Sequence, residues 1–328
     1  MQRKFTFFTV FLLVSLYAAG QQDPQFSQYM FDPLFFNPGY IGMGEGICVS
    51  GLYRQQWVGF KDVDGNKVAP ETYTIAVHAP LSVLHGGLGA TITNDKLGFE
   101  SNITLKLGYA YHLTTTSGTL SIGAMADFVD KSMDFSKLKF IDSDPLTSQL
   151  GNERQMIVDV ALGAYYQVPG EYYLGLSATQ ILQSASKTLS ATEKSVMKLQ
   201  LIRQYFVTAG YEYTFASNPA FMLQPSLLFK TDLASFQFDI SGLLNYNNRF
   251  WCGLSYRFQD AVVVILGMQY KNFRIGYSYD ITTSTLGGRR SSGSHEIMAG
   301  YCFKLEVEKL RQGYKLSLIH ISEPTRPY

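Results

Sequence analysis

The stretch from Phe273 to Asp280 reads FRIGYSYD, and its side chains alternate between two kinds. One set comprises Phe273, Ile275, Tyr277 and Tyr279, and the other comprises Arg274, Gly276, Ser278 and Asp280. Successive side chains of an extended strand point to opposite faces, so this strand has one aromatic and apolar face and one polar face. A strand placed between lipid and a polar lumen needs both faces. The stretch therefore predicts a wall strand of a membrane barrel.

The same alternation is clear in residues 101–113, 155–168 and 235–247. Ile103, Leu105 and Leu107, for example, are separated by Thr104 and Lys106. A soluble β-sandwich also alternates, so this pattern alone does not place the sheet in a membrane.

Period-two runs that end at turn residues predict about fourteen strands. They cover residues 46–57, 71–79, 86–94, 101–113, 118–129, 155–168, 172–179, 201–215, 220–230, 235–247, 249–257, 261–270, 273–281 and 294–303. An even number is expected for a single-chain bacterial barrel. We therefore predict an all-β fold, a transmembrane antiparallel outer-membrane β-barrel of about fourteen strands.

The lengths of the connections add an independent argument. Residues 58–70, 130–154, 180–200 and 282–293 form long polar links. Most of the alternate links are short, such as residues 271–272, although the links after the ninth and eleventh predicted strands are short as well. Barrels place short turns in the periplasm and long loops outside, which predicts that both termini lie in the periplasm.

The composition agrees with a barrel wall. Of the 328 residues, 16% are charged and 14% are aromatic, whereas ordinary soluble domains have roughly 25% charged residues. Aromatic girdles at both membrane interfaces account for such an aromatic content. A formal net charge of +1 gives no argument for nucleic acid as a partner.

The first twenty residues have the pattern of a secretory signal peptide. Arg3 and Lys4 precede an apolar run of 13 residues, and the small residues before Gln21 predict cleavage between Gly20 and Gln21. A spanning helix needs roughly 20 apolar residues, and no later stretch reaches that length. Because Gln21 is not cysteine, we do not expect a lipoprotein.

The chain then divides into four predicted parts. These are a signal peptide (1–20), an extended N-terminal segment (21–45), the barrel (46–303) and a C-terminal tail (304–328). The end of the tail, residues 316–328, reads LSLIHISEPTRPY and has the character of a non-native extension.

No motif predicts catalysis, a metal or a cofactor. Zinc-binding and phosphate-binding patterns are missing, which leaves a Ser/His lipase as the enzymatic alternative. Residues 62–66, DVDGN, lack the closing glutamate of a calcium loop and are interpreted as a solvated loop. Cys48, Cys252 and Cys302 each lie in a strand pattern, and we interpret them as packing residues of the wall rather than as a disulfide or a metal site.

The segment from Gln22 to Gly42 reads QDPQFSQYMFDPLFFNPGYIG and shows neither helical nor strand periodicity. Its three X-Pro steps and six aromatic residues predict an extended segment with a large apolar surface. Two interpretations remain open. The segment packs into the lumen or along the periplasmic rim, or it forms a docking surface for a partner, and the two are compatible.

This segment, together with residues 52–60 (LYRQQWVGF) and 87–98 (GLGATITNDKLG), resembles the PorP/SprF family of type IX secretion system membrane proteins of Bacteroidota. The resemblance covers about residues 21–303. It implies an outer-membrane barrel without catalysis or cofactor that works with periplasmic and outer-membrane secretion components, a lipoprotein partner among them. It also implies a role in exporting surface proteins, in some members gliding adhesins.

The resemblance assigns candidate docking residues on the periplasmic side. They are Asp23, Pro24, Phe26, Tyr29, Phe31, Pro33, Asn37, Pro38, Tyr40, Arg54, Gln55 and Trp57. The main alternative is a diffusion or solute channel. Charges that the alternation assigns to the inner face, such as Lys106, Asp159, Asp239 and Arg274, suit a water-filled lumen and a polar plug equally well.

Overall fold

The structure is a computed structural model that describes residues 24–44, 46–62, 64–134, 152–185, 189–192, 195–197, 200–284 and 291–304. The predicted signal peptide and most of the predicted tail lie outside these residues, as do Gly20, Gln21 and Asp23.

Most described residues belong to one antiparallel sheet. Its strands are β1 (Gly46–Gln55), β2 (Glu71–Leu81), β3 (Gly86–Leu97), β4 (Glu100–Thr114), β5 (Thr119–Asp134), β6 (Asn152–Val168), β7 (Tyr172–Thr179), β10 (Gln204–Tyr211), β11 (Tyr213–Thr214), β12 (Phe221–Thr231), β13 (Phe236–Tyr246), β14 (Phe250–Arg257), β15 (Ala261–Tyr270), β16 (Phe273–Thr282) and β17 (Ser294–Lys304). A separate hairpin joins β8 (Leu189–Thr192) to β9 (Ser195–Met197).

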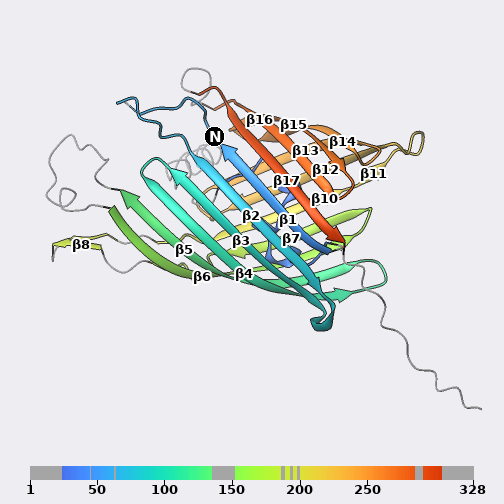
Figure 1. Cartoon of the computed structure of the whole chain (residues 1–328), viewed down its shortest axis with the longest axis horizontal. Helices are drawn as coiled ribbons and strands as arrows, with labels where there is room; N and C mark the ends of the chain where they lie inside the picture. The colour runs from blue at the N-terminus through green and yellow to red at the C-terminus, as the bar shows by residue number, and fades with distance from the viewer. Residues whose placement is uncertain are drawn as a thin grey trace, which may run out of the picture.

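The sheet closes into a ring. β1 pairs with β17, and β10 pairs with both β7 and β12. Since β10 and β11 both pair with β12, they count as one wall strand, and the described residues then form a closed barrel of fourteen strands. Figure 1 shows the tilted strands, with β1 beside β17. The predicted architecture is confirmed. No helix among the described residues is long and apolar enough to cross a membrane.

The two faces of the wall follow the predicted alternation. In β16, Phe273, Ile275 and Tyr277 are exposed on the outer face, whereas Ser278 and Asp280 are buried inside. The burial patterns of the other strands alternate similarly, as in β13. The lipid-facing surface and the lumen are therefore built from alternate residues of the same strands.

The two ends of the barrel differ in their connections. Residues 56–70, 180–203 and 283–293 join strands at one end, and short turns such as residues 169–171 and 271–272 join them at the other. A short 3-10 turn, η4 (Ser82–Leu84), lies in one of these turns. From the long connections we call the first end outer and the second end periplasmic.

Two cysteines form a disulfide bond, which corrects the sequence interpretation. Cys48 of β1 is bonded to Cys302 of β17, and Cys252 is free. The interpretation was wrong because Cys48 and Cys302 are 254 residues apart, and only the closure of the ring brings them opposite each other.

Candidate functional site

Residues 24–44, which we call the plug, occupy the lumen. Three 3-10 turns shape the plug: η1 (Tyr29–Phe31), η2 (Pro33–Phe35) and η3 (Pro38–Tyr40). Its buried residues include Phe26, Ser27, Gln28, Tyr29, Asp32, Leu34, Phe35, Phe36, Asn37 and Ile41. The aromatic residues among them, Phe26, Tyr29, Phe35 and Phe36, pack in one cluster with inward-facing wall residues such as Leu52, Phe206 and Trp251. The lumen is thus filled by the chain's own N-terminal segment.

The plug runs from the outer end of the barrel to the periplasmic end. Pro24 lies beside Asp95 and Lys131, near the outer ends of β3 and β5. At the other end, the Gly42 N–H donates to His78 Nδ1 (3.2 Å). The prediction that this segment emerges into the periplasm therefore fits Gly42 but is wrong for Pro24. The physical reason is that β1 starts at the periplasmic end, so a segment anchored at the outer end has to cross the lumen to reach it.

Five buried charged residues surround the outer half of the plug. They are Arg54 of β1, Asp239 of β13, Arg257 of β14, Asp280 of β16 and Glu296 of β17. Arg54 lies 2.8 Å from Asp280 and 3.1 Å from Glu296. Arg257 lies 3.0 Å from both Asp239 and Asp280. Each guanidinium has two carboxylate partners among these five residues, which is the arrangement that buried charges require.

The plug backbone is bonded directly to this charge cluster. Ser27 Oγ donates to Asp280 Oδ1 (2.7 Å) and accepts a hydrogen bond from Arg54 Nη1 (2.9 Å). The N–H groups of Ser27 and Gln28 each donate to one carboxylate oxygen of Glu296, both at 2.8 Å. Hydrogen bonds to ionised groups are about twice as strong as neutral ones. The cluster therefore fixes the position of the plug relative to β1, β16 and β17.

Aromatic rings pack in the middle of the plug. Phe35 makes edge-to-face contacts with Phe26 and Phe36, at centroid distances of 4.4 and 5.0 Å. Phe36 in turn lies 5.5 Å from Phe206 of β10. Such pairs are worth about 0.5–1.5 kcal/mol each beyond their buried area. The six aromatics of the sequence motif are thus largely explained by packing inside the barrel.

Glycines of the wall make room for Asn37 and Pro38 of the plug. A Cβ atom on Gly123 of β5 would lie 2.2 Å from the Pro38 carbonyl oxygen, and one on Gly163 of β6 would lie 2.1 Å from Asn37 Oδ1. Asn37 Nδ2 also donates to the Ala164 carbonyl (3.0 Å). A Cβ atom at either position would overlap the plug, so only glycine fits there. The wall is therefore shaped to hold the plug.

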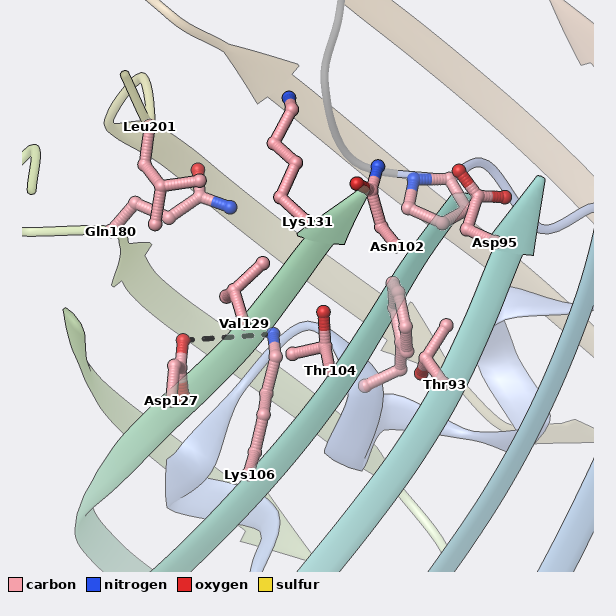
Figure 2. Close-up of a pocket in the computed structure, with 12 residues that line it drawn as sticks. Thr93, Asp95, Asn102, Thr104, Lys106, Asp127, Val129, Lys131, Gln180 and Leu201 are labelled. Atoms are coloured by element: carbon pink, nitrogen blue, oxygen red, sulfur yellow. Dashed lines mark ion pairs between the residues drawn. The ribbon is translucent and has the colours of Figure 1, made fainter. Parts of the chain in front are cut away.

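A small chamber opens beside the outer half of the plug. It has a volume of about 50 Å³. Its lining residues are Pro24, Phe35, Thr93, Asp95, Asn102, Thr104, Lys106, Asp127, Val129, Lys131, Gln180 and Leu201. Figure 2 shows Thr93, Asn102 and Lys106 pointing into it, with Lys106 paired to Asp127 (3.9 Å). Its lining carries charges of both signs, Asp95 and Asp127 against Lys106 and Lys131.

A larger cavity of about 190 Å³, which we call the vestibule, lies at the periplasmic end. It is lined by Met30, Phe31, Pro33, Tyr40, Tyr165, Gln167, Tyr173, Tyr211, Glu212, Gln224, Pro225, Ser226, Leu243 and Arg274. Tyr40 contacts Tyr165 edge to face (5.2 Å), and the Arg274 guanidinium lies over the Phe31 ring (5.2 Å). The vestibule thus combines aromatic surface with one guanidinium and one carboxylate.

The candidate docking residues are spread over several parts of the structure. Phe26, Tyr29 and Asn37 are buried in the lumen, whereas Phe31 and Tyr40 are half-buried and line the vestibule. Pro33 and Pro38 begin η2 and η3, where the fixed φ of proline suits a first helical position. Arg54 belongs to the charge cluster, and Pro24 lies at the outer end.

The remaining two candidates lie at the outer end of β1. Gln55 is the last residue of β1, opposite Glu71 and His295. The Trp57 N–H donates to Ser294 Oγ (3.0 Å), and its φ of 50° is in the left-handed region. These two residues therefore lie at the opposite end of the barrel from the vestibule.

Sequence reasoning did not identify the charge cluster as a site. Asp239 and Asp280 were assigned to the inner face by alternation, but Ser27, Arg257 and Glu296 were not singled out. The alternation along each strand was the available signal, because it shows which charged residues face inward. Inward-facing charges on neighbouring strands must be paired inside a closed barrel.

The described residues contain no group of three or more side chains suited to hold a metal. In the loop of residues 61–67, Asp62 accepts hydrogen bonds from the side chain and backbone of Asn66. These bonds, the Asn66 side chain first, lower the pKa of Asp62. Its carboxylate is thus engaged within the loop itself.

Comparison with known proteins assigns the chain to a family. A family model described as type IX secretion system membrane protein PorP/SprF matches residues 18–301. The chain belongs to the PorP/SprF family. The match includes the whole described plug and the wall from β1 to most of β17. Membership places this PorP/SprF protein in the outer membrane, among the components of type IX secretion.

Solved structures with a similar shape are outer-membrane proteins of low sequence identity, and no curated protein matches. The Ralstonia pickettii toluene transporter TbuX is 17% identical over 81% of this chain and 92% of its own (TM-score 0.48). The Pseudomonas putida toluene transporter TodX is 12% identical over 82% and 92% (TM-score 0.47). The Acinetobacter baumannii protein Omp33 is 8% identical over 79% and 98% (TM-score 0.44). At this level of similarity, their ligands give no argument about this PorP/SprF protein.

Proposed function

We propose that this PorP/SprF protein is a non-enzymatic docking component of the type IX secretion system. In this role it binds periplasmic secretion components, a lipoprotein among them, and supports export or surface display of cargo proteins, with gliding adhesins as one candidate cargo. The observation that carries the proposal is the filled lumen. A solute channel needs a continuous water path, whereas a docking barrel does not.

Two anchors argue that the plug stays in place. The charge cluster binds Ser27 and Gln28 near the outer end of the barrel. The wall glycines Gly123 and Gly163 contact Asn37 and Pro38, which are closer to the periplasmic end. Displacing the plug would remove the Ser27 and Gln28 N–H groups from Glu296 and the Ser27 hydroxyl from Arg54, Arg257 and Asp280. It would also expose the aromatic rings of the plug to water. Both costs oppose opening.

The vestibule is the proposed docking surface for a periplasmic partner. Phe31 and Tyr40 are half-buried there, so part of each ring remains accessible at the periplasmic end. Aromatic side chains supply a large contact area at low ordering cost and are enriched at interface hot spots. The Arg274 guanidinium beside Phe31 adds a hydrogen-bond donor to the same surface.

A crosslinked pull-down from native envelopes tests the docking role. We expect a periplasmic secretion lipoprotein to be recovered with the wild type, and at least tenfold less with a Phe31→Ala and Tyr40→Ala double variant. Tyr111→Ala is the matched control, because Tyr111 is an aromatic residue on the lipid face near the same end. Equal recovery from both variants would remove the vestibule from the docking surface.

Planar-bilayer recording separates docking from the channel alternative. The filled lumen predicts no steady conductance for the wild-type barrel. Stable conductance by the purified protein, together with loss of solute uptake in a deletion strain that still secretes normally, would establish the channel instead.

A further inference from the structure

The seam between β1 and β17 is where the first and last wall strands meet. Its ladder runs from Gly46 opposite Lys304 at the periplasmic end to Gln55 opposite His295 at the outer end. Before this ladder forms, the sheet has two open edges. The seam is the pairing between the strands farthest apart in the chain, and it depends on closure of the whole ring.

Side-chain bonds cross the seam near both of its ends. Near the outer end, Arg54 and Glu296 are register partners and form a buried ion pair. Near the periplasmic end, Cys48 and Cys302 are register partners and form the disulfide. Figure 1 shows β1 and β17 side by side along the seam. The outer end is thus held by charge and the periplasmic end by a covalent bond.

The disulfide lies beside Gly44, where the chain passes from the plug to β1. A Cβ on Gly44 would lie 2.8 Å from Cys48 Sγ and 3.1 Å from a ring carbon of His78. The chain leaves the lumen here and enters β1 two residues later. The disulfide is therefore packed against the segment that joins the plug to β1.

We propose that the Cys48–Cys302 bond is a covalent latch, formed after the barrel has closed around the plug, which prevents the periplasmic end of the seam from opening. Disulfide formation needs two cysteine Cα atoms within about 7 Å. With 254 residues between them, Cys48 and Cys302 meet this condition through the β1–β17 register. The bond is therefore a product of closure rather than its cause.

The latch forms by thiol–disulfide exchange in the oxidising periplasm. One thiolate attacks the disulfide of an oxidised dithiol carrier and gives a mixed disulfide with one carrier thiolate released. The second cysteine thiolate then displaces the other carrier sulfur. The protein loses two protons and two electrons, and the carrier leaves as a dithiol.

A covalent bond is useful at this end because strand ends open first. The last register pair of the seam among the described residues joins Gly46 to Lys304, two positions from the Cys48–Cys302 pair. Cys252 lies on the exposed face of β14 and does not take part.

Counting thiols tests whether the bond exists. Wild-type protein extracted from envelopes, denatured and alkylated with a polyethylene-glycol maleimide should carry one adduct, and three after reduction. Cys252→Ser should carry none, and two after reduction. Three adducts on unreduced wild type would overturn the proposal.

Hydrogen exchange tests the latch itself. In a Cys48→Ser and Cys302→Ser double variant, we expect the amides of residues 46–50 and 300–304 to exchange at least tenfold faster. Exchange at Tyr53 to Gln55, beside the Arg54–Glu296 pair, should be unchanged, as should all exchange in Cys252→Ser. Equal exchange at the periplasmic end in all proteins would overturn the latch.

Refolding tests the order of events and does not depend on the variants. Wild-type protein diluted from urea into detergent with a reductant should close into a heat-modifiable barrel, and oxidant added afterwards should form the bond. Reduced protein that cannot close would overturn the proposal, because the disulfide would then be a condition of closure. These readouts do not involve secretion, so they are independent of the proposed function.

Discussion

Ser27 joins the plug to the wall through a small hydroxyl and one N–H group. Its Oγ lies within hydrogen-bond distance of Asp280, Arg54 and Arg257 at once. A hydroxyl can donate one hydrogen bond and accept two, so this position uses its full capacity. The fit explains why a polar residue stands in a segment otherwise rich in aromatics.

The charge cluster predicts a large effect of a single substitution. Arg54→Met removes the cation between Asp280 and Glu296, and leaving buried charge uncompensated costs about 3–5 kcal/mol. Urea unfolding of the barrel in detergent measures the loss. Lys67→Met is the control, because its pair with Glu71 spans 3.9 Å and is largely exposed, so we expect a loss below about 1 kcal/mol. Equal losses would mean that the buried network contributes no more than a surface pair.

For a single wall residue, the sequence predicts the face to which its side chain points but not the side chain that it contacts. Asp239 was correctly assigned to the inner face, and its burial confirms this. Its partner Arg257 lies 18 residues away on the next strand, and the pairing depends on the register between β13 and β14. For Cys48 and Cys302 the register is set only at the seam. Long-range partners of this kind are fixed by closure of the whole sheet.

Among the elements, the wall strands were the most predictable because their alternation is local. The plug was less predictable, since η1, η2 and η3 are short 3-10 turns without a periodic pattern. Packing in the lumen was one of the two interpretations left open, and the structure supports it. The direction of the plug could not be inferred, because it depends on the bonds of Ser27 and Gln28 to distant strands.

The wall glycines give a prediction about the plug as an element. Gly123→Ala and Gly163→Ala each place a Cβ against the plug at Pro38 or Asn37. Forced overpacking costs about 1–3 kcal/mol, so we expect the barrel to assemble and the plug to loosen. Limited proteolysis should then cut within residues 24–44 at least tenfold faster than in the wild type.

Gly242→Ala is the control for this pair, because a Cβ at Gly242 meets nothing within 4 Å. Its plug should be cut at the wild-type rate. If the three variants behave alike, the close contact of Gly123 and Gly163 with the plug does not hold it in place.

The polarity of the strands predicts the behaviour of two neighbouring sites on β4. Leu107 is exposed on the outer face, whereas Thr104 lines the outer chamber beside Asp127. An arginine facing lipid costs about 2–4 kcal/mol near the bilayer midplane. We expect Leu107→Arg to reduce the yield of heat-modifiable barrel and Thr104→Arg to leave it nearly unchanged. A reversed order of yields would mean that the two faces are exchanged.

As a whole molecule, the barrel is closed in two senses. The fourteen-strand ring is closed at its seam by the Arg54–Glu296 pair and the disulfide, and the lumen is closed by the plug. The charge cluster contributes to both, because Glu296 bonds Arg54 across the seam and also the plug backbone. A seam weakened at the Arg54–Glu296 pair should therefore also loosen the plug at the outer end.

The last prediction concerns the function of the closed barrel in the cell. If the protein docks secretion components, deleting its gene should abolish secretion or surface display of one or a few cargo proteins while general outer-membrane composition is unchanged. Quantitative proteomics of the medium and of the cell surface measures this.

Wild-type protein should restore display, and the Phe31→Ala and Tyr40→Ala variant should restore less than about a tenth of it, although its heat-modifiable barrel forms normally. The vestibule is the only part of the molecule that this double substitution is designed to change, so full restoration would mean that partners dock elsewhere on the barrel. Unchanged secretion in the deletion strain would contradict the docking role itself.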